Sequence, residues 1–128
     1  MDPNIRRALA HGHTIDITTK GRRSGEPRRL EIVFHVFDGR IYISGMPNAH
    51  RKRAWLANLE ANPAMAFHLK GAVAADLPAK ARVITDPVER RQILEQAARV
   101  WRRDPATMIE HSPLIEVTIP GYERAAAA

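Results

Sequence analysis

The order of alternating and helical hydrophobic patterns along the chain predicts a small antiparallel β protein. The clearest pattern is a β-hairpin, in which residues 28–37 and 40–44 form the strands and Asp38-Gly39 forms a tight turn. The first of these strands turns four apolar side chains to one face: Leu30, Ile32, Phe34 and Val36. Residues 13–19 alternate in the same way and predict a strand before the hairpin.

Helical periodicity replaces alternation in the segments that follow. Residues 50–61 predict a helix that ends at Asn62-Pro63, because the proline ring disfavours a helical residue before it. Asp86 is a candidate N-cap of a second helix to about Arg103, with Pro87 in its first position and Glu89 at the capping-box position. Its expected apolar stripe is Ile93, Ala97, Val100 and Trp101.

Short helices are predicted after Pro3 and after Asp104-Pro105. Further strands are expected at 64–69, at 72–85 with Pro78 at an edge or bulge, and after Pro113. Short links between most strands favour an antiparallel barrel with two to four short flanking helices outside it. The fold class is therefore mainly β (α+β), in one domain over 1–128, with 1–12 as an N-terminal helix or arm and 122–128 as a flexible tail.

Composition removes several kinds of chemistry. The 128 residues include no cysteine, which excludes disulfides, thiolate metal sites and cysteine nucleophiles. No stretch of about 18 apolar residues is present, and the first residues lack the apolar core of a signal peptide. We therefore expect a cytoplasmic protein.

The net charge of +6 favours an anionic partner. Basic residues concentrate in two segments, 20–29 and 51–53, of which the first contains Glu26 as its one acid. A third group alternates with acids on the late helix, and we interpret it as a solvated face: Arg90, Arg91, Arg99, Arg102 and Arg103.

Familiar catalytic motifs are missing, including the nucleophile elbow, the zinc-protease helix and the Gly-rich nucleotide loops. We expect no metal site, even at His11-x-His13, and we interpret His35 and His68 as hydrogen-bonded strand residues. If the protein is an enzyme, a cofactor must supply the chemistry.

The loop at 20–29 is suited to hold the anionic part of such a cofactor. Gly21 and Gly25 leave backbone amides accessible, Ser24 adds a hydroxyl, and Arg23 and Arg28 can hold one phosphate from two sides. A second element, Ser44-Gly45-Met46-Pro47, leaves the hairpin just before the basic helix start. Cations in a first helical turn oppose the helix dipole, so a nearby anion would account for Arg51, Lys52 and Arg53.

Three stretches together resemble the deazaflavin-dependent nitroreductases, a family of split β-barrels in the flavin/deazaflavin oxidoreductase superfamily. They are TTKGRRSGEPR (18–28), the strand pair around Asp38-Gly39, and RKRAWLANLEANP (51–63). The resemblance covers about 14–118. It implies reduced coenzyme F420 as the cofactor and hydride transfer to a quinone, nitro compound or activated alkene.

The resemblance also implies roles for particular residues. Those expected to bind the cofactor are Arg22, Arg23, Ser24, Gly25, Arg28, Ser44, Gly45, Met46, Arg51, Lys52, Arg53 and Trp55. The turn SGMPN departs from the A-S-x-G-G that the family usually carries, and the segment 102–113 lacks the usual tyrosine near the acceptor. Glu110 or His111 could take the place of that tyrosine.

Other interpretations stay open at this point. The same barrel accommodates FMN in related families, and a carrier that binds a flavin or deazaflavin without turnover fits the missing tyrosine. Nucleic-acid binding is disfavoured, because aromatic residues make up 5% of the chain and Trp55 alone accompanies the basic clusters. An exposed sheet edge would favour a homodimer.

Overall fold

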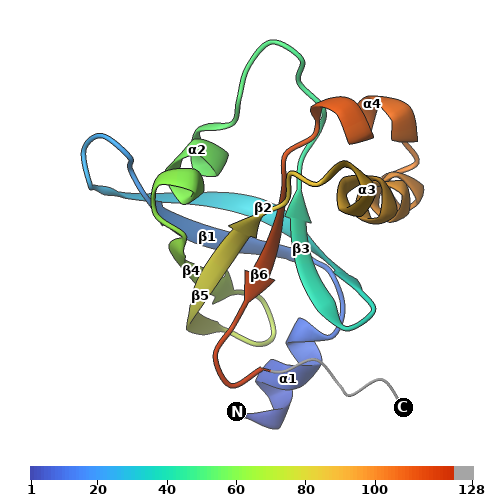
Figure 1. Cartoon of the computed structure of the whole chain (residues 1–128). Helices are drawn as coiled ribbons and strands as arrows, with labels where there is room; N and C mark the ends of the chain where they lie inside the picture. Colours follow the sequence, from blue (N-terminus) through green and yellow to red (C-terminus); the bar gives the residue numbers. More distant parts are fainter. Residues whose placement is uncertain (123–128) are drawn as a thin grey trace.

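The computed structural model describes residues 1–122, which form a closed six-stranded barrel with four helices (Figure 1). The strands are β1 (Thr14–Lys20), β2 (Pro27–Phe37), β3 (Arg40–Ser44), β4 (Ala64–Leu69), β5 (Ala75–Val83) and β6 (Leu114–Thr118). The helices are α1 (Pro3–Leu9), α2 (Ala54–Ala61), α3 (Pro87–Trp101) and α4 (Pro105–His111). The barrel and its flanking helices confirm the predicted fold class, and nearly all of the expected tail lies outside the described residues.

All six strand pairings are antiparallel, in the order β1-β2-β3-β6-β5-β4 and back to β1. Asp38 and Gly39 both have positive φ, 52° and 71°, as the tight hairpin turn requires. Pro78 pairs in register with Ala66 of β4 and lies in the half of β5 that β6 does not reach. The barrel is closed only in part along its strands: residues 27–33 of β2 pair with β1 alone and residues 75–79 of β5 pair with β4 alone. These one-sided stretches are the exposed sheet edges on which the homodimer prediction rests.

The barrel interior is filled by the alternating apolar side chains. Phe34 and Phe67 meet edge to face at a centroid distance of 5.2 Å. Around them lie fully buried isoleucines from β1, β3 and β6: Ile15, Ile17, Ile43 and Ile115. Helix α1 covers the lower end of the barrel in Figure 1 and buries Leu9. A Cβ on Gly12 would lie 2.3 Å from the carbonyl oxygen of Phe34, so the link from α1 needs glycine there.

Helix α2 begins later than the periodicity predicted. It starts at Ala54, and Arg53 is an extended N-cap residue whose side chain makes no capping bond. Arg51 and Lys52 therefore precede the helix instead of occupying its first turn. The dipole argument from those cations was wrong. The segment 45–53 arches over the end of the barrel (Figure 1), and its Asn48 amide donates to the His111 carbonyl at 3.5 Å.

The predicted N-cap of helix α3 is confirmed, whereas its capping box and part of its buried face were predicted wrongly. Asp86 caps it by accepting a 2.9 Å hydrogen bond from the Glu89 amide, but the Glu89 carboxylate pairs with Arg82 instead of closing a capping box. Val100 points to solvent, and the buried face is Ile93, Leu94, Ala97 and Ala98. Arg90, expected on a solvated face, is half-buried, because its guanidinium binds backbone carbonyls.

The two strand histidines differ. His68 is hydrogen-bonded as predicted, to Thr18 and Asp76, each at 2.7 Å. His35 is buried against Phe37 and Trp101, and its Nε2 has no partner, so the prediction of a hydrogen-bonded His35 was wrong at that nitrogen. Residues 1–122 contain no cluster of three or more His, Asp or Glu side chains that could hold a metal ion. No helix in that range has the length and apolarity to cross a bilayer.

His35 should make the protein sensitive to acid. Burial lowers the pKa of His35 from 6.5 to about 4, so the unfolded chain binds this proton more readily than the folded one. Its contribution to stability is complete above pH 6.5 and is lost as the pH falls toward 4. We expect His35→Leu to reduce the loss of unfolding free energy between pH 7 and pH 4.5 by about 2 to 3 kcal/mol, measured by urea denaturation. Exposed His11→Leu serves as the control, and an unchanged pH dependence in His35→Leu would contradict this account.

Candidate functional site

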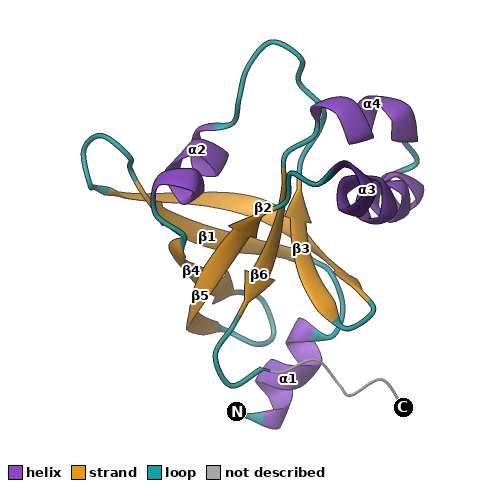
Figure 2. Ribbon diagram, viewed as in Figure 1, coloured by secondary structure: helices purple, strands orange, loops and turns teal. Residues whose placement is uncertain are grey.

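One end of the barrel collects the chain segments that carry polar chemistry (Figure 2). Antiparallel pairing aligns the end of β1, the end of β3 and the start of β6, because Ser44 pairs with Leu114 and Thr18 pairs with Ala66. The loop 21–26, the segment 45–53 and the links 84–86 and 112–113 therefore all open at this end.

A cavity of about 440 Å³ lies between the β1–β2 loop and α2, and we call it the arginine cavity. Its lining residues are Thr19, Gly21, Arg22, Arg23, Ser24, Arg28, Arg29, Leu30, Arg53, Ala54, Trp55 and Asn58. No Asp or Glu of residues 1–122 is among them. Five arginines from two separate segments thus line one cavity, although the Arg29 guanidinium is bound to Asp16.

The β1–β2 loop has a defined internal structure. Gly21 donates its amide to the Glu26 carbonyl at 2.8 Å, and Gly25 donates to the Gly21 carbonyl at 2.8 Å. Gly25 has φ 72°, which favours glycine. The Ser24 hydroxyl accepts from the Glu26 amide at 3.1 Å and lies 3.4 Å from an Arg28 Nη. The Arg28 side chain thereby reaches back to the loop, and both Arg28 and Arg23 line the arginine cavity.

Asn58 anchors this loop to α2. Its Oδ1 accepts from the Arg22 backbone amide at 3.1 Å, and its Nδ2 donates to Thr19 Oγ1 at 3.1 Å. Both Asn58 and Thr19 are buried. Sequence reasoning did not select Asn58 as a site residue, although an asparagine three residues after Trp55, on the apolar face of a short helix, is a usable signal.

The charges in the arginine cavity are poorly neutralised. Arg29 pairs with Asp16 at 2.9 Å. Arg23 makes no hydrogen bond or ion pair within the described part of the chain. Arg53 donates from Nη2 to the Met46 carbonyl at 2.9 Å, while its Nε is buried without a partner. The cavity can therefore receive an anion without first breaking internal ion pairs.

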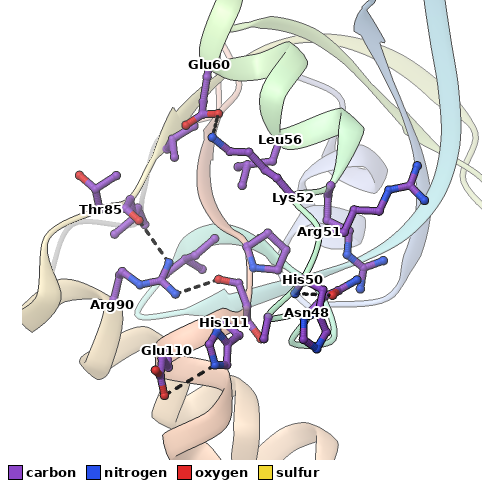
Figure 3. A pocket seen from close by; sticks show the side chains of 17 residues that line it. Asn48, His50, Arg51, Lys52, Leu56, Glu60, Thr85, Arg90, Glu110 and His111 are labelled. Carbon is purple, nitrogen blue, oxygen red and sulfur yellow. Dashed lines mark hydrogen bonds and ion pairs between the residues drawn. The ribbon is translucent and has the colours of Figure 1, made fainter.

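A second cavity of about 560 Å³ shares Arg53 with the first and lies between the segment 45–53, α2 and α4 (Figure 3). We call it the α4 cavity. Its polar lining includes His50, Arg51, Lys52, Arg90, His111 and Ser112, with Glu60 and Glu110 as its acids. Glu60 is paired with Lys52, and Glu110 Oε2 lies 3.7 Å from His111 Nε2.

Arg90 holds α4 against the barrel. Its Nη2 donates to the carbonyls of Ile109 and Ser112, each at 2.8 Å, and Nε also reaches Ile109 at 3.3 Å. Burial lowers the pKa of this guanidinium. Two main-chain carbonyls on either side of Glu110 and His111 are thus fixed by one side chain of α3.

Three of the four buried side-chain nitrogen and oxygen atoms without partners in residues 1–122 belong to this end of the barrel: Ser44 Oγ, Arg53 Nε and Ser112 Oγ. Their parts of the chain meet, since a Cβ on Gly45 would lie 3.1 Å from Pro113 Cγ and 3.8 Å from Arg53 Nη2. Buried polar groups in native proteins are normally hydrogen-bonded, so this grouping is consistent with a ligand that supplies the missing partners.

The sequence-predicted residues divide between the two cavities. Six of them line the arginine cavity: Arg22, Arg23, Ser24, Arg28, Arg53 and Trp55. Arg51 and Lys52 line the α4 cavity. Ser44, Gly45 and Met46 lie at the junction without lining either, and Gly25 occupies the loop tip. The structure adds Thr19, Arg29, Asn58, Arg90 and Ser112, which sequence reasoning did not propose as site residues.

Comparison with known proteins identifies what this arrangement is similar to. A family model described as F420H(2)-dependent quinone reductase matches residues 2–120. A search of curated proteins finds no match.

Solved structures with the same fold include two F420 reductases. One, an F420-H2 dependent reductase (FDR-A), has a TM-score of 0.61 and 20% identity, over 82% of this chain and 93% of that one. A second, titled F420 reductase, has a TM-score of 0.67 and 15% identity, over 94% and 96%. A conserved hypothetical protein from Mycobacterium tuberculosis has a TM-score of 0.71 and 16% identity, over 94% of this chain and 81% of that one. At these identities the likeness shows the split β-barrel fold.

Loss of the Arg90 fork should loosen α4. Arg90→Lys keeps the charge but cannot hold both carbonyls, so at least one buried acceptor loses its donor. We expect the free energy of unfolding to fall by about 1 to 3 kcal/mol, measured by urea denaturation. Arg91→Lys, at the exposed neighbouring position, is the matched control and should change stability little. Equal stability of the two variants would show that the two hydrogen bonds of the Arg90 guanidinium are not needed.

Proposed function

The chain belongs to the F420H(2)-dependent quinone reductase family, and from this premise we propose where its cofactor and acceptor bind. Membership makes the protein an oxidoreductase that uses reduced F420 as a hydride donor to an organic acceptor. We assign the anionic tail of F420 to the arginine cavity and a quinone acceptor to the α4 cavity.

The observation that supports the cofactor assignment is the unneutralised charge of the arginine cavity. A phosphate diester needs cations with free N–H groups, and planar guanidinium forks match its oxygens. Arg23 lies in the β1–β2 loop, Arg28 reaches Ser24 of that loop from the start of β2, and Arg53 precedes α2. The remaining wall of the cavity is lined by Trp55, Leu30 and the backbone at Gly21. The residues present therefore fit the tail of F420.

The junction between the cavities fits the ring end. When bound, reduced F420 supplies the hydride, and this chain provides orientation and exclusion of water. Ser44, Gly45 and Met46 lie at that junction, where Ser44 Oγ and Arg53 Nε lack partners. We propose that they hold the ring and that Arg51 and Lys52 border the space beyond it.

A quinone in the α4 cavity would contact both apolar and cationic groups. Leu56, Val83 and Leu114 provide apolar surface, and Arg90 and Arg51 provide positive potential. Positive potential stabilises the negative charge that a quinone gains when hydride arrives. This combination favours a quinone over a purely aliphatic acceptor.

The alternatives are weaker. Family membership favours F420 over FMN and turnover over a carrier role. We also propose a cytoplasmic enzyme, which the absence of cysteine supports. A homodimer stays a prediction; one structural neighbour, with a TM-score of 0.61 and 19% identity, is described as a domain-swapped dimer.

The cofactor assignment can be tested with a double variant. Arg23→Ala with Arg28→Ala should weaken F420 binding at least tenfold, about 1.4 kcal/mol, because two charge-assisted contacts are removed. The melting temperature should change little, since neither side chain has a buried partner. Quenching of F420 fluorescence measures the affinity and calorimetry the stability.

Arg91→Ala with Arg103→Ala provides the control, because it removes the same charge from exposed positions on and after α3. If the control weakens F420 binding equally, net charge and not the arginine cavity governs affinity. A loss of folding stability in the Arg23/Arg28 variant would instead assign these residues a structural role.

A further inference from the structure

Hydride transfer to a quinone leaves an oxyanion that requires a proton, and the α4 cavity limits which side chain can supply it. No tyrosine of residues 1–122 lines this cavity. Arginine and lysine hold their protons too tightly at neutral pH, and a serine hydroxyl is a poor acid. Histidine is the side chain whose ordinary titration lies near neutrality, which leaves His50 and His111.

We propose that His111 is the catalytic acid of this enzyme, held in place by Arg90. This inference rests on the proposed location of the acceptor in the α4 cavity. His111 is the last residue of α4, and its side chain is about one-third exposed. His50, in the segment 45–53, is exposed, and the hydrogen bond that it makes to Asn48 comes from its backbone amide and not from its ring.

The position of His111 is fixed on both sides. Arg90 binds the carbonyls of Ile109 and Ser112, and Ser112 donates its amide to the Met108 carbonyl at 2.9 Å. The imidazole can therefore turn about its side-chain bonds while its backbone stays in place. Arg90 acts here as a positioning residue.

The charged groups around His111 are suited to proton delivery. Glu110, on its own helix, lies 3.7 Å from His111 Nε2 at the solvent side. Arg51 from the segment 45–53 and Arg90 from α3 line the cavity and favour an oxyanion in it, while Lys52 is paired with Glu60.

The proposed step balances as follows. Bound reduced F420 would supply the hydride, and the acceptor would then carry a negative charge on a former carbonyl oxygen. The N–H bond of the His111 imidazolium then breaks as the O–H bond of the quinol forms, which leaves a neutral imidazole. Solvent restores the proton at the exposed face beside Glu110. The unpartnered Ser112 hydroxyl is available to hydrogen-bond the same oxygen.

Steady-state reduction of menadione by reduced F420 tests this role. We expect the rate of the parent enzyme to decline as the pH rises above neutrality. His111→Gln should lower turnover at least tenfold at neutral pH and abolish that decline. Affinity for F420 should stay within twofold, and added imidazole should restore part of the rate. Exposed His11→Gln should behave as the parent.

A second readout needs no cofactor. 2-Hydroxy-1,4-naphthoquinone is an oxyanion at neutral pH and mimics the reduced acceptor. In the cofactor-free protein its binding should raise the NMR titration midpoint of His111 by about one unit, as a nearby opposite charge does, while the resonance of His11 stays unchanged.

Several results would overturn the proposal. One is a parent-like pH profile in His111→Gln; another is loss of the profile in His50→Gln instead. A third is an NMR titration midpoint of His111 that does not change when 2-hydroxy-1,4-naphthoquinone binds. Failure of the Arg23/Arg28 variant to affect F420 binding would reject the cofactor location but leave these His111 measurements interpretable.

Discussion

Closure of the barrel is the constraint on which the rest of this molecule depends. Pairing of β1 with β4, and of β3 with β6, closes the sheet on itself and brings distant parts of the chain to one rim. The β1–β2 loop and the start of α2 are about thirty residues apart, yet Asn58 joins them directly. Without that closure the arginines would belong to two unrelated surfaces.

Sequence patterns predicted most of the framework. The alternation around Asp38-Gly39 predicted the hairpin correctly, because a period of two assigns each side chain to one face of the sheet. Asp86 was also predicted correctly as the N-cap of α3, since its carboxylate can accept a backbone amide of the first turn. The start of α2 was misplaced, since nothing in the basic segment before Ala54 distinguishes an extended chain from a helical turn. Local periodicity defines elements well and their boundaries less well.

The candidate site was only partly predictable. The arginines of the first loop and Trp55, which the sequence marked through glycine and clustered charge, line one cavity with Arg53, and their role in binding stays a prediction. Arg90 was misinterpreted: its neighbours in sequence are charged and exposed, whereas its partners are carbonyls that only tertiary structure supplies. Every residue has a main-chain carbonyl, so the sequence does not indicate which carbonyls will accept a side-chain hydrogen bond. An arginine that binds them therefore has the same sequence pattern as a solvent-exposed one.

The way in which Arg90 holds α4 has an evolutionary consequence. Its bonds go to carbonyl oxygens, which every amino acid possesses, so residues 110 and 111 can be exchanged without weakening the anchor. Single substitutions at positions 110 and 111 can therefore change the lining of the α4 cavity in the course of evolution, while the barrel and the arginine cavity stay constant.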